Sequence, residues 1–173
     1  MNTDLAAVWD EHVRAEFELK DADAAVATMC DDATLLHVPV ATGERGIEAL
    51  RRFYAEVFIP SWPDDTDVTE VSRTVSGDRV VDEMVVRGTH DRVMMFNLPG
   101  VEPTGRRFEL PHVAVVEFRD GKIAAERIYW DQASLLVQLG LLPAESAPML
   151  GVAQTRAYED PTYPLNQLIE DSQ

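Results

Sequence analysis

The segment from Gly121 to Gly140 constrains the fold of this chain more than any other part of the sequence. It reads GKIAAERIYWDQASLLVQLG, and the Asp-Gly dipeptide at its start is a strong signal for a tight hairpin turn. The strand that follows stops at Tyr129, Trp130 and Asp131, where an amphipathic helix begins. Aromatic neighbours partly remove a carboxylate at such a junction from water, so we predict chemistry at Asp131. The alternative is that Asp131 is simply the N-cap of this helix, a role that does not exclude catalysis.

Composition and charge limit the class of protein and its partners. The 173 residues are 46% hydrophobic, which suits one domain with a real core. The formal net charge of −16 makes nucleic acid and anionic membranes poor partners. No apolar run approaches the roughly 20 residues that span a bilayer, and the first residues lack the pattern of a signal peptide. The single cysteine, Cys30, excludes an intrachain disulfide, and we expect a cytoplasmic protein.

The histidines do not form a recognisable metal motif. All four lie far apart in the sequence, without the spacing of a zinc helix or finger. A glycine-rich phosphate loop and a serine nucleophile elbow are also missing from the sequence. We therefore expect neither a metal nor a cofactor. His12 borders the apolar stripe of the first expected helix, and we interpret it as a packed histidine rather than a ligand.

Hydrophobic spacing predicts three helices and one strand in the first part of the chain. The helices are expected at 4–20, from Asp21 or Asp23 to Met29, and at 46–58, with a strand at 34–40. Pro60 and Pro63 should stop the third helix.

Two antiparallel hairpins are expected after residue 67. In the first, over 68–90, a two-residue Gly-Asp loop pairs Arg73 with Asp82, which we interpret as a surface ion pair. The second spans 108–130 around the Asp-Gly turn. A two-residue loop there places His112 opposite Tyr129, with Asp131 diagonal to His112 on the same side of the sheet. A single bulge would scatter these three side chains.

Two segments have no regular hydrophobic period. Residues 91–107 are rich in glycine, proline and apolar residues, and they either fold over the core or form a lid on a pocket. Residues 143–173 contain four prolines and are expected to form an extended tail, packed on the body or on a partner subunit. The main domain is therefore expected to span 1–142.

The order of these elements predicts an α+β fold. It resembles the cone-shaped fold of the nuclear transport factor 2-like (cystatin-like) superfamily, in which helices from the first half of the chain pack on the concave face of a curved antiparallel sheet. The segment GKIAAERIYWDQASLLVQLG resembles, without gaps, the end of the SnoaL-like polyketide cyclases. The segment LPGVEPTGRRFELP resembles the approach to the penultimate long strand in SnoaL-like proteins of uncertain function.

The resemblance implies a function and a set of site residues. The family's catalytic aspartate, just before the last helix, falls on Asp131, while its pocket histidine falls on Ala114, two residues from His112. We therefore expect a cofactor-independent enzyme in which Asp131 acts as general acid/base on a small apolar carbonyl or ester substrate. His112 or Tyr129 would donate a hydrogen bond to the enolate oxygen, in an aldol-type cyclisation or an isomerisation. The superfamily also implies a homodimer through the open sheet face.

Further residues are expected around the substrate, and two other functions stay open. The expected substrate-binding residues are His37, Tyr54, Glu83, His90, Phe96 and Trp130. One alternative is a hydrolase, such as an epoxide hydrolase, that activates water with Asp131, Glu83 and either Arg87 or Arg127. The other is a ligand-binding dimer without chemistry, because this fold hosts many functions.

Overall fold

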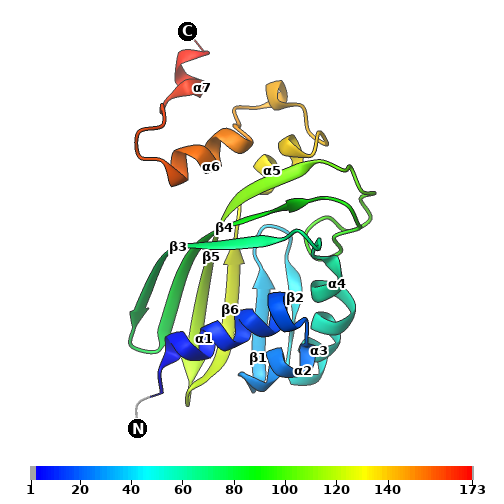
Figure 1. Ribbon diagram of the computed structural model, residues 1–173, viewed down its shortest axis with the longest axis vertical. Helices are drawn as coiled ribbons and strands as arrows, with labels where there is room; N and C mark the ends of the chain where they lie inside the picture. Colours follow the sequence, from blue (N-terminus) through cyan, green and yellow to red (C-terminus); the bar gives the residue numbers. More distant parts are fainter. Residues whose placement is uncertain (1–2, 173) are drawn as a thin grey trace.

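The computed structural model describes residues 3–172 and shows helices packed on the concave face of one strongly curved sheet (Figure 1). The sheet has six strands in the order β2-β1-β6-β5-β4-β3. The strands are β1 (Met29–His37), β2 (Thr42–Arg45), β3 (Asp67–Ser76), β4 (Arg79–Thr89), β5 (Arg107–Arg119) and β6 (Lys122–Tyr129). All neighbouring pairs are antiparallel except β1 and β6, which run parallel. The predicted α+β cone is confirmed, with a mixed sheet in place of a purely antiparallel one.

The helices of the first half of the chain follow the prediction closely. They are α1 (Leu5–Arg14), the π-helical turn η1 (Ala15–Leu19), α2 (Ala22–Ala27), α3 (Ile47–Phe53), the π-helical turn η2 (Tyr54–Phe58) and α4 (Ile59–Ser61). Asp21 is the N-cap of α2, because its carboxylate accepts from the backbone N–H groups of Asp23 and Ala24. The third helix runs past Pro60, so the predicted stop at this residue is wrong. The helix ends one residue later, at Ser61, and before Pro63, which agrees with the second predicted stop.

The strand predicted at 34–40 begins earlier, at Met29, and ends at His37. Its partner β2 was not predicted, because its sequence TGER is short and has no apolar alternation. Gly43 of β2 lies so close to β1 that a Cβ atom there would come within 2.1 Å of the Leu35 carbonyl oxygen. Only glycine fits this close approach of two backbones.

The first hairpin has the predicted register, with Arg73 opposite Asp82 and Ser76 opposite Arg79. The interpretation of Arg73 and Asp82 as a surface pair is wrong, because Asp82 is only 3% exposed. Its Oδ2 atom accepts from Nε1 of Trp9 at 2.7 Å and from Nη2 of Arg73 at 2.9 Å. The inner face of β4 lies under α1, so this carboxylate helps to hold the helix on the sheet.

The second hairpin keeps the predicted register only for the two residue pairs next to its loop. Phe118 pairs with Ile123 as expected, but a bulge then shifts the ladder. Tyr129 consequently lies opposite Val113 and not His112. Because strand side chains alternate between faces, this one-residue shift sends His112 and Tyr129 to opposite sides of the sheet.

Residues 91–106 fold over one end of the core. Met94, Phe96 and Leu98 are each at most 2% exposed, whereas Met95 is 47% exposed. The segment therefore covers the core, and because Phe96 also lines a cavity, the predicted role as a lid on a pocket stays open.

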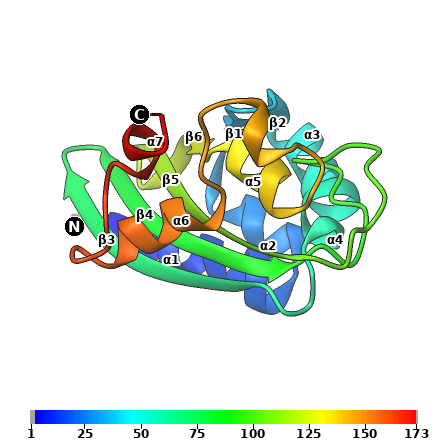
Figure 2. The same ribbon diagram turned by 90° about the horizontal axis from the view of Figure 1, so that it is seen from above.

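The tail after residue 142 is not simply extended. It contains η3 (Ala144–Ser146), α6 (Val152–Glu159) and α7 (Gln167–Glu170), and it follows α5 (Gln132–Gln138). Figures 1 and 2 show α6 lying against β5, where Thr155 is buried and its hydroxyl donates to the Glu109 carbonyl oxygen at 2.6 Å. The prolines flank residues 152–159 without interrupting them, so an eight-residue helix fits there. Within residues 3–172, no helix is long and apolar enough to cross a bilayer.

Candidate active site

A small, partly enclosed cavity lies between the concave face of the sheet and the helices. Its volume is about 40 Å³, and most of its wall is apolar or aromatic. Four of its lining side chains carry titratable groups: Glu16, His37, His112 and Glu126. A space of this size holds only one or a few water molecules, so a larger ligand enters only if the aromatic side chains move.

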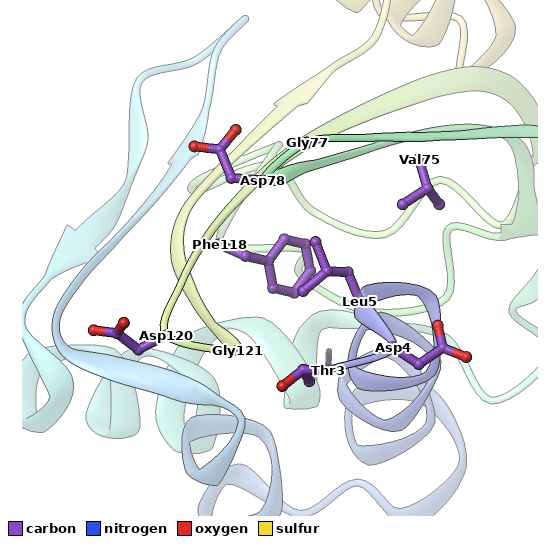
Figure 3. Close-up of a pocket in the computed structure, with 9 residues that line it drawn as sticks. All are labelled: Thr3, Asp4, Leu5, Val75, Gly77, Asp78, Phe118, Asp120 and Gly121. Carbon is purple, nitrogen blue, oxygen red and sulfur yellow. The ribbon is translucent and has the colours of Figure 1, made fainter. Parts of the chain in front are cut away.

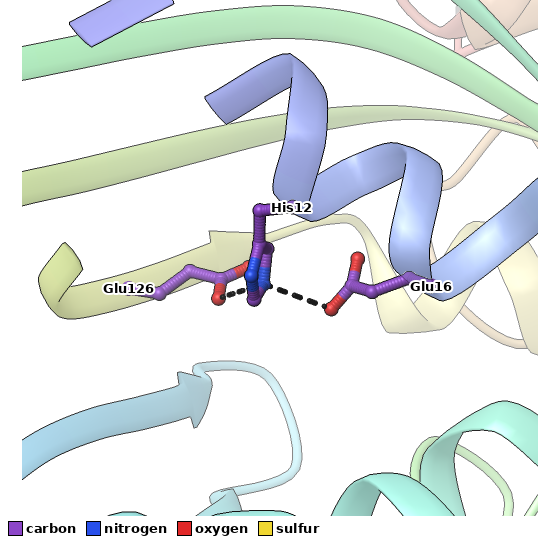
Figure 4. Close-up of side chains that lie close together, drawn as sticks. All are labelled: His12, Glu16 and Glu126. Carbon is purple, nitrogen blue, oxygen red and sulfur yellow. Dashed lines mark ion pairs between the residues drawn. The ribbon is translucent and has the colours of Figure 1, made fainter. Parts of the chain in front are cut away.

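Three buried titratable side chains meet at the wall of this cavity (Figure 4). Nε2 of His12 lies 3.2 Å from Oε1 of Glu16 and 3.5 Å from Oε2 of Glu126. The hydroxyl of Tyr54 lies 3.2 Å from the same nitrogen. All of these side chains are at most 4% exposed, so the group forms a charged cluster inside an apolar core. We call His12, Glu16 and Glu126 the buried triad.

The sequence brings the buried triad together in two ways. His12 and Glu16 stand one turn apart on α1 and η1, so they share a helix face. Glu126 reaches the interior because the bulge in β6 moves it to the inner face. Without the bulge, Arg127 would point inward instead. The sequence analysis missed Glu16 and Glu126, although a histidine and a glutamate four residues apart on an apolar stripe were a usable signal.

Hydrogen bonds determine the protonation of His12. The hydroxyl of Thr28 donates to the Ala25 carbonyl oxygen at 2.7 Å, so its oxygen accepts from Nδ1–H of His12 at 2.8 Å. Burial lowers the pKa of His12, but the charge of Glu16 and hydrogen bonds to Glu126 and Glu16 outweigh it and raise this pKa to about 10. His12 is therefore an imidazolium at neutral pH.

Glu16 differs from a surface glutamate in its protonation. Burial raises its pKa, and the nearby His12 charge only partly opposes this effect. A carboxyl group with a raised pKa at a cavity wall can give and take a proton closer to neutral pH. The buried triad therefore has the electrostatics of a general acid/base site.

The same cavity contains two neutral histidines on the inner faces of β1 and β5. Burial and, to a smaller extent, the nearby His112 lower the pKa of His37 to about 3. Burial also lowers the pKa of His112 to about 4, against a raising effect of its bond to Leu110. Nδ1 of His112 donates to the Leu110 carbonyl oxygen at 3.1 Å, which leaves Nε2 as an acceptor.

The three residues predicted to catalyse do not meet in the structure. Asp131 is the N-cap of α5, and its Oδ1 atom accepts from the N–H groups of Ala133 at 2.9 Å and Ser134 at 3.2 Å. It is half-buried and is not among the cavity-lining residues described. Tyr129 is 41% exposed on the outer face, while His112 is buried at the cavity. The catalytic role of Asp131 stays a prediction, and its observed role is that of a helix cap.

The predicted substrate-binding residues divide into two groups. His37 and Phe96 line the cavity, Tyr54 belongs to the surroundings of the buried triad, and the Trp130 ring stacks on His112 with centroids 5.5 Å apart. The other two lie elsewhere. His90 is buried in the segment after β4, with Nδ1 3.2 Å from the Thr104 hydroxyl. Glu83 bonds to the Ser72 hydroxyl on the outer face.

The residues expected for water activation are also outside the cavity. Arg87 pairs with Glu109 and Glu159, and Arg127 pairs with Glu117. These ion pairs lie on the outer face of the sheet, where side chains of β4, β5 and β6 alternate with the buried ones.

A larger hollow of about 720 Å³ lies at the other end of the sheet (Figure 3). It is an open groove between the hairpin loops and the start of α1. Phe118 and Leu5 face each other at its centre, and the carboxylates of Asp4, Asp78 and Asp120 point outward around it. A hollow this open leaves its carboxylates in water, whereas the titratable groups at the small cavity are buried, so we place the candidate site there.

The buried triad also has the composition of a metal site. One ligand atom from each of its three side chains lies within 4.8 Å of the others. Imidazole and carboxylate groups suit zinc, iron or manganese. The sequence-based expectation of no metal stays a prediction.

Comparisons with known proteins give the family of this chain and support its fold. The family model of the SnoaL-like polyketide cyclases matches residues 3–139. A candidate SnoaL-like polyketide cyclase from Jannaschia sp. CCS1 is 22% identical, with a TM-score of 0.64 over 83% of this chain and 99% of its own. AclR, a candidate hydroxylase from Streptomyces galilaeus, is 26% identical, with a TM-score of 0.59 over 80% of this chain and 86% of its own.

A third solved structure is described as having a ketosteroid isomerase-like fold. A hypothetical protein from Catenulispora acidiphila, with a ketosteroid isomerase-like fold and in complex with trimethylamine, is 20% identical. Its TM-score is 0.60 over 86% of this chain and 100% of its own. No curated protein matches the chain.

Proposed function

This chain belongs to the SnoaL-like polyketide cyclase family, and we propose that it transfers a proton on a small carbonyl compound by general acid/base catalysis. The observation that carries the proposal is Glu16, a buried glutamate with a raised pKa at the wall of a small apolar cavity. Its family already makes it a small-molecule enzyme or binding protein. The acid/base assignment to Glu16 is the new step, and it replaces Asp131 with a residue that lines the cavity.

The reaction begins at a carbon next to the substrate carbonyl. The Glu16 carboxylate takes the proton from that carbon, and the C–H electron pair moves to the carbonyl oxygen as an enolate. If the substrate has a C=C bond at its β and γ carbons, the enolate extends over that bond, and protonated Glu16 returns the proton to the γ carbon, which gives the conjugated isomer. Alternatively, the enolate carbon attacks a second carbonyl of the substrate, which forms the new C–C bond of an aldol-type cyclisation, and the oxygen of that second carbonyl takes the proton back from Glu16.

The neighbours of Glu16 have separate roles in this scheme. The His12 imidazolium stabilises the ionised form of Glu16 at 3.2 Å, and Glu126 balances the charge of His12. Nε2 of neutral His112 can only accept a hydrogen bond, so it suits a hydroxyl group of the substrate and cannot donate to the enolate oxygen. This reverses the donor role expected for His112 from the resemblance.

Exchange of solvent deuterium into β-tetralone, followed by NMR in deuterium oxide, tests the proposal. This ketone has acidic C–H bonds next to its carbonyl and needs no second substrate. We expect Glu16→Gln to slow the enzyme-catalysed exchange by about 100-fold or more, the usual contribution of an acid/base group. Glu18→Gln is the matched control, because Glu18 lies in the same π-helical turn but its side chain is 72% exposed. Equal rates for the two variants would refute the assignment.

A hydrolytic reaction is the second candidate, and the cavity volume favours it. A space of about 40 Å³ beside Glu16 and Glu126 fits a water molecule that one of the carboxylates could deprotonate. This activated-water scheme uses the buried triad in place of Asp131, Glu83 and an arginine. Incorporation of heavy oxygen from labelled water into the product of an epoxide or ester substrate would identify it.

Ligand binding without chemistry is supported by the same small volume, because the cavity is filled largely by its own aromatic side chains. A ligand that stabilises the protein against heat, with no exchange or turnover, would favour this function.

The expected homodimer through the outer sheet face also stays a proposal. On that face, Leu36 is 39% exposed and Tyr129 is 41% exposed. Sedimentation should give a dimer for the wild type and a monomer for Tyr129→Glu if this face is the interface.

A further inference from the structure

Two buried polar side chains at the cavity have no hydrogen-bond partner within residues 3–172. Both ring nitrogens of His37 and the indole Nε1 of Trp62 are in this state. His37 is 2% exposed and Trp62 is 6% exposed, and both line the cavity. Buried polar groups of native proteins are nearly always paired, and each exception calls for an explanation.

The surroundings of these two side chains are aromatic. The His37 ring centroid lies 4.9 Å from that of Phe96 and 5.4 Å from that of Phe58. The Trp62 ring centroid lies 4.8 Å from that of Phe96 and 5.8 Å from that of Phe58. Phe58 and Phe96 therefore connect His37 to Trp62 without offering either one a hydrogen bond.

The chemistry of the unpaired atoms restricts what can satisfy them. The indole N–H of Trp62 only donates, so it needs an acceptor such as a carbonyl oxygen. Neutral His37 has one donor and one acceptor nitrogen, so it can pair with a hydroxyl group. Glu16 and Glu126 on the cavity wall and the net charge of −16 oppose an anion. The aromatic walls favour a flat, apolar ring.

We propose that His37 and Trp62 form a recognition site for an uncharged ring that carries a carbonyl oxygen and a hydroxyl group. Because the cavity of about 40 Å³ is smaller than such a ring, Phe58 and Phe96 must move apart to admit it. Trp62 then donates to the carbonyl oxygen, His37 pairs with the hydroxyl, and the two phenyl groups pack on the ring. The site rests on the proposed function only in taking the same cavity as the ligand site. Binding there does not require Glu16 to exchange a proton.

Isothermal titration with four matched probes tests the recognition site. The probes are para-hydroxyacetophenone, which has both groups, acetophenone, which lacks the hydroxyl, para-ethylphenol, which lacks the carbonyl, and the anion para-hydroxybenzoate. We expect para-hydroxyacetophenone to bind between about twofold and tenfold more tightly than either neutral probe, the usual gain from one hydrogen bond. The anion should bind most weakly. Equal affinities, undetectable binding of para-hydroxyacetophenone, or tighter binding of the anion would overturn the proposal.

Two variants assign each group to its partner. Trp62→Phe should lose the preference for para-hydroxyacetophenone over para-ethylphenol, and His37→Phe should lose the preference over acetophenone. Removing an unpaired buried polar group is neutral or stabilising, so both ligand-free variants should unfold at or above the wild-type temperature. A preference that survives in Trp62→Phe overturns the proposal even if His37→Phe does not fold. Glu16→Gln should keep both preferences among the neutral probes, so this binding test and the deuterium-exchange test can fail independently of each other.

Discussion

Two regions of the molecule hold a carboxylate beside aromatic rings, and they use it differently. At the junction of β6 and α5, Asp131 accepts hydrogen bonds from two backbone N–H groups and from the Ser134 hydroxyl. At the cavity, Glu16 is bound to a buried imidazole and faces a partly enclosed space. A carboxylate is therefore available for chemistry when its partner is titratable and when a cavity lies beside it.

The comparison predicts a large difference in stability between the two regions. His12→Gln leaves two buried carboxylates without their cation, so we expect a loss of about 3–5 kcal/mol in the free energy of unfolding. Asp131→Ala removes a helix cap and should cost about 0.5–2 kcal/mol. Urea denaturation of both variants measures these values. A larger loss for the Asp131 variant would reverse the order of the two regions.

The pH dependence of stability separates the two sets of cavity histidines. The folded-state pKa of His12 is raised from 6.5 to about 10, so its stabilisation is complete below pH 6.5 and is lost as the pH rises towards 10. The pKa values of His37 and His112 are lowered from 6.5 to about 3 and about 4, so their effect is lost as the pH falls below 6.5. Each group changes the free energy of unfolding by up to about 1.4 kcal/mol per pH unit within its window.

Variants make this pH prediction specific. His12→Gln should flatten the alkaline side of the stability curve, and His112→Phe should reduce the slope on the acid side. Thermal unfolding between pH 4 and pH 10 gives both slopes. An unchanged alkaline slope in His12→Gln would contradict the assignment of an imidazolium to the buried triad.

The smallest expected effect belongs to the cap itself. Asp131→Ser retains an N-cap acceptor, so it should recover most of the roughly 1 kcal/mol lost in Asp131→Ala. Thermal unfolding of the two variants gives the difference. If Asp131→Ser is as destabilised as Asp131→Ala, the charge of Asp131 matters for more than capping.

Most of the fold could be predicted from the sequence, because its signals are local. The stripe of the first helix, the cap at Asp21 and the Gly-Asp and Asp-Gly turns each depend on neighbouring residues. The parallel pairing of β1 with β6 joins residues far apart in the sequence, so no local pattern predicts it. The short β2 has no apolar alternation by which it could be recognised.

The site was harder to predict because one residue decides which side chains reach the cavity. The bulge in β6 turns Glu126 inward and Tyr129 outward, so the predicted meeting of His112, Tyr129 and Asp131 could not survive it. Alternation of apolar and polar residues does not reveal a bulge when it falls on two successive alanines, here Ala124 and Ala125. His37 and Phe96 line the cavity, although the sequence left open whether His37 faces a cavity or solvent. Their role in binding a substrate stays a prediction.

The central claim is that the proton-transfer group is Glu16 of the buried triad and not Asp131. A direct test compares deuterium exchange into β-tetralone by Glu16→Gln and Asp131→Asn in parallel, with folding of both variants checked by circular dichroism. We predict that Glu16→Gln loses about 100-fold or more of the rate, whereas Asp131→Asn stays within about tenfold of wild type. Loss of exchange in Asp131→Asn together with a near-normal rate in Glu16→Gln would contradict the account.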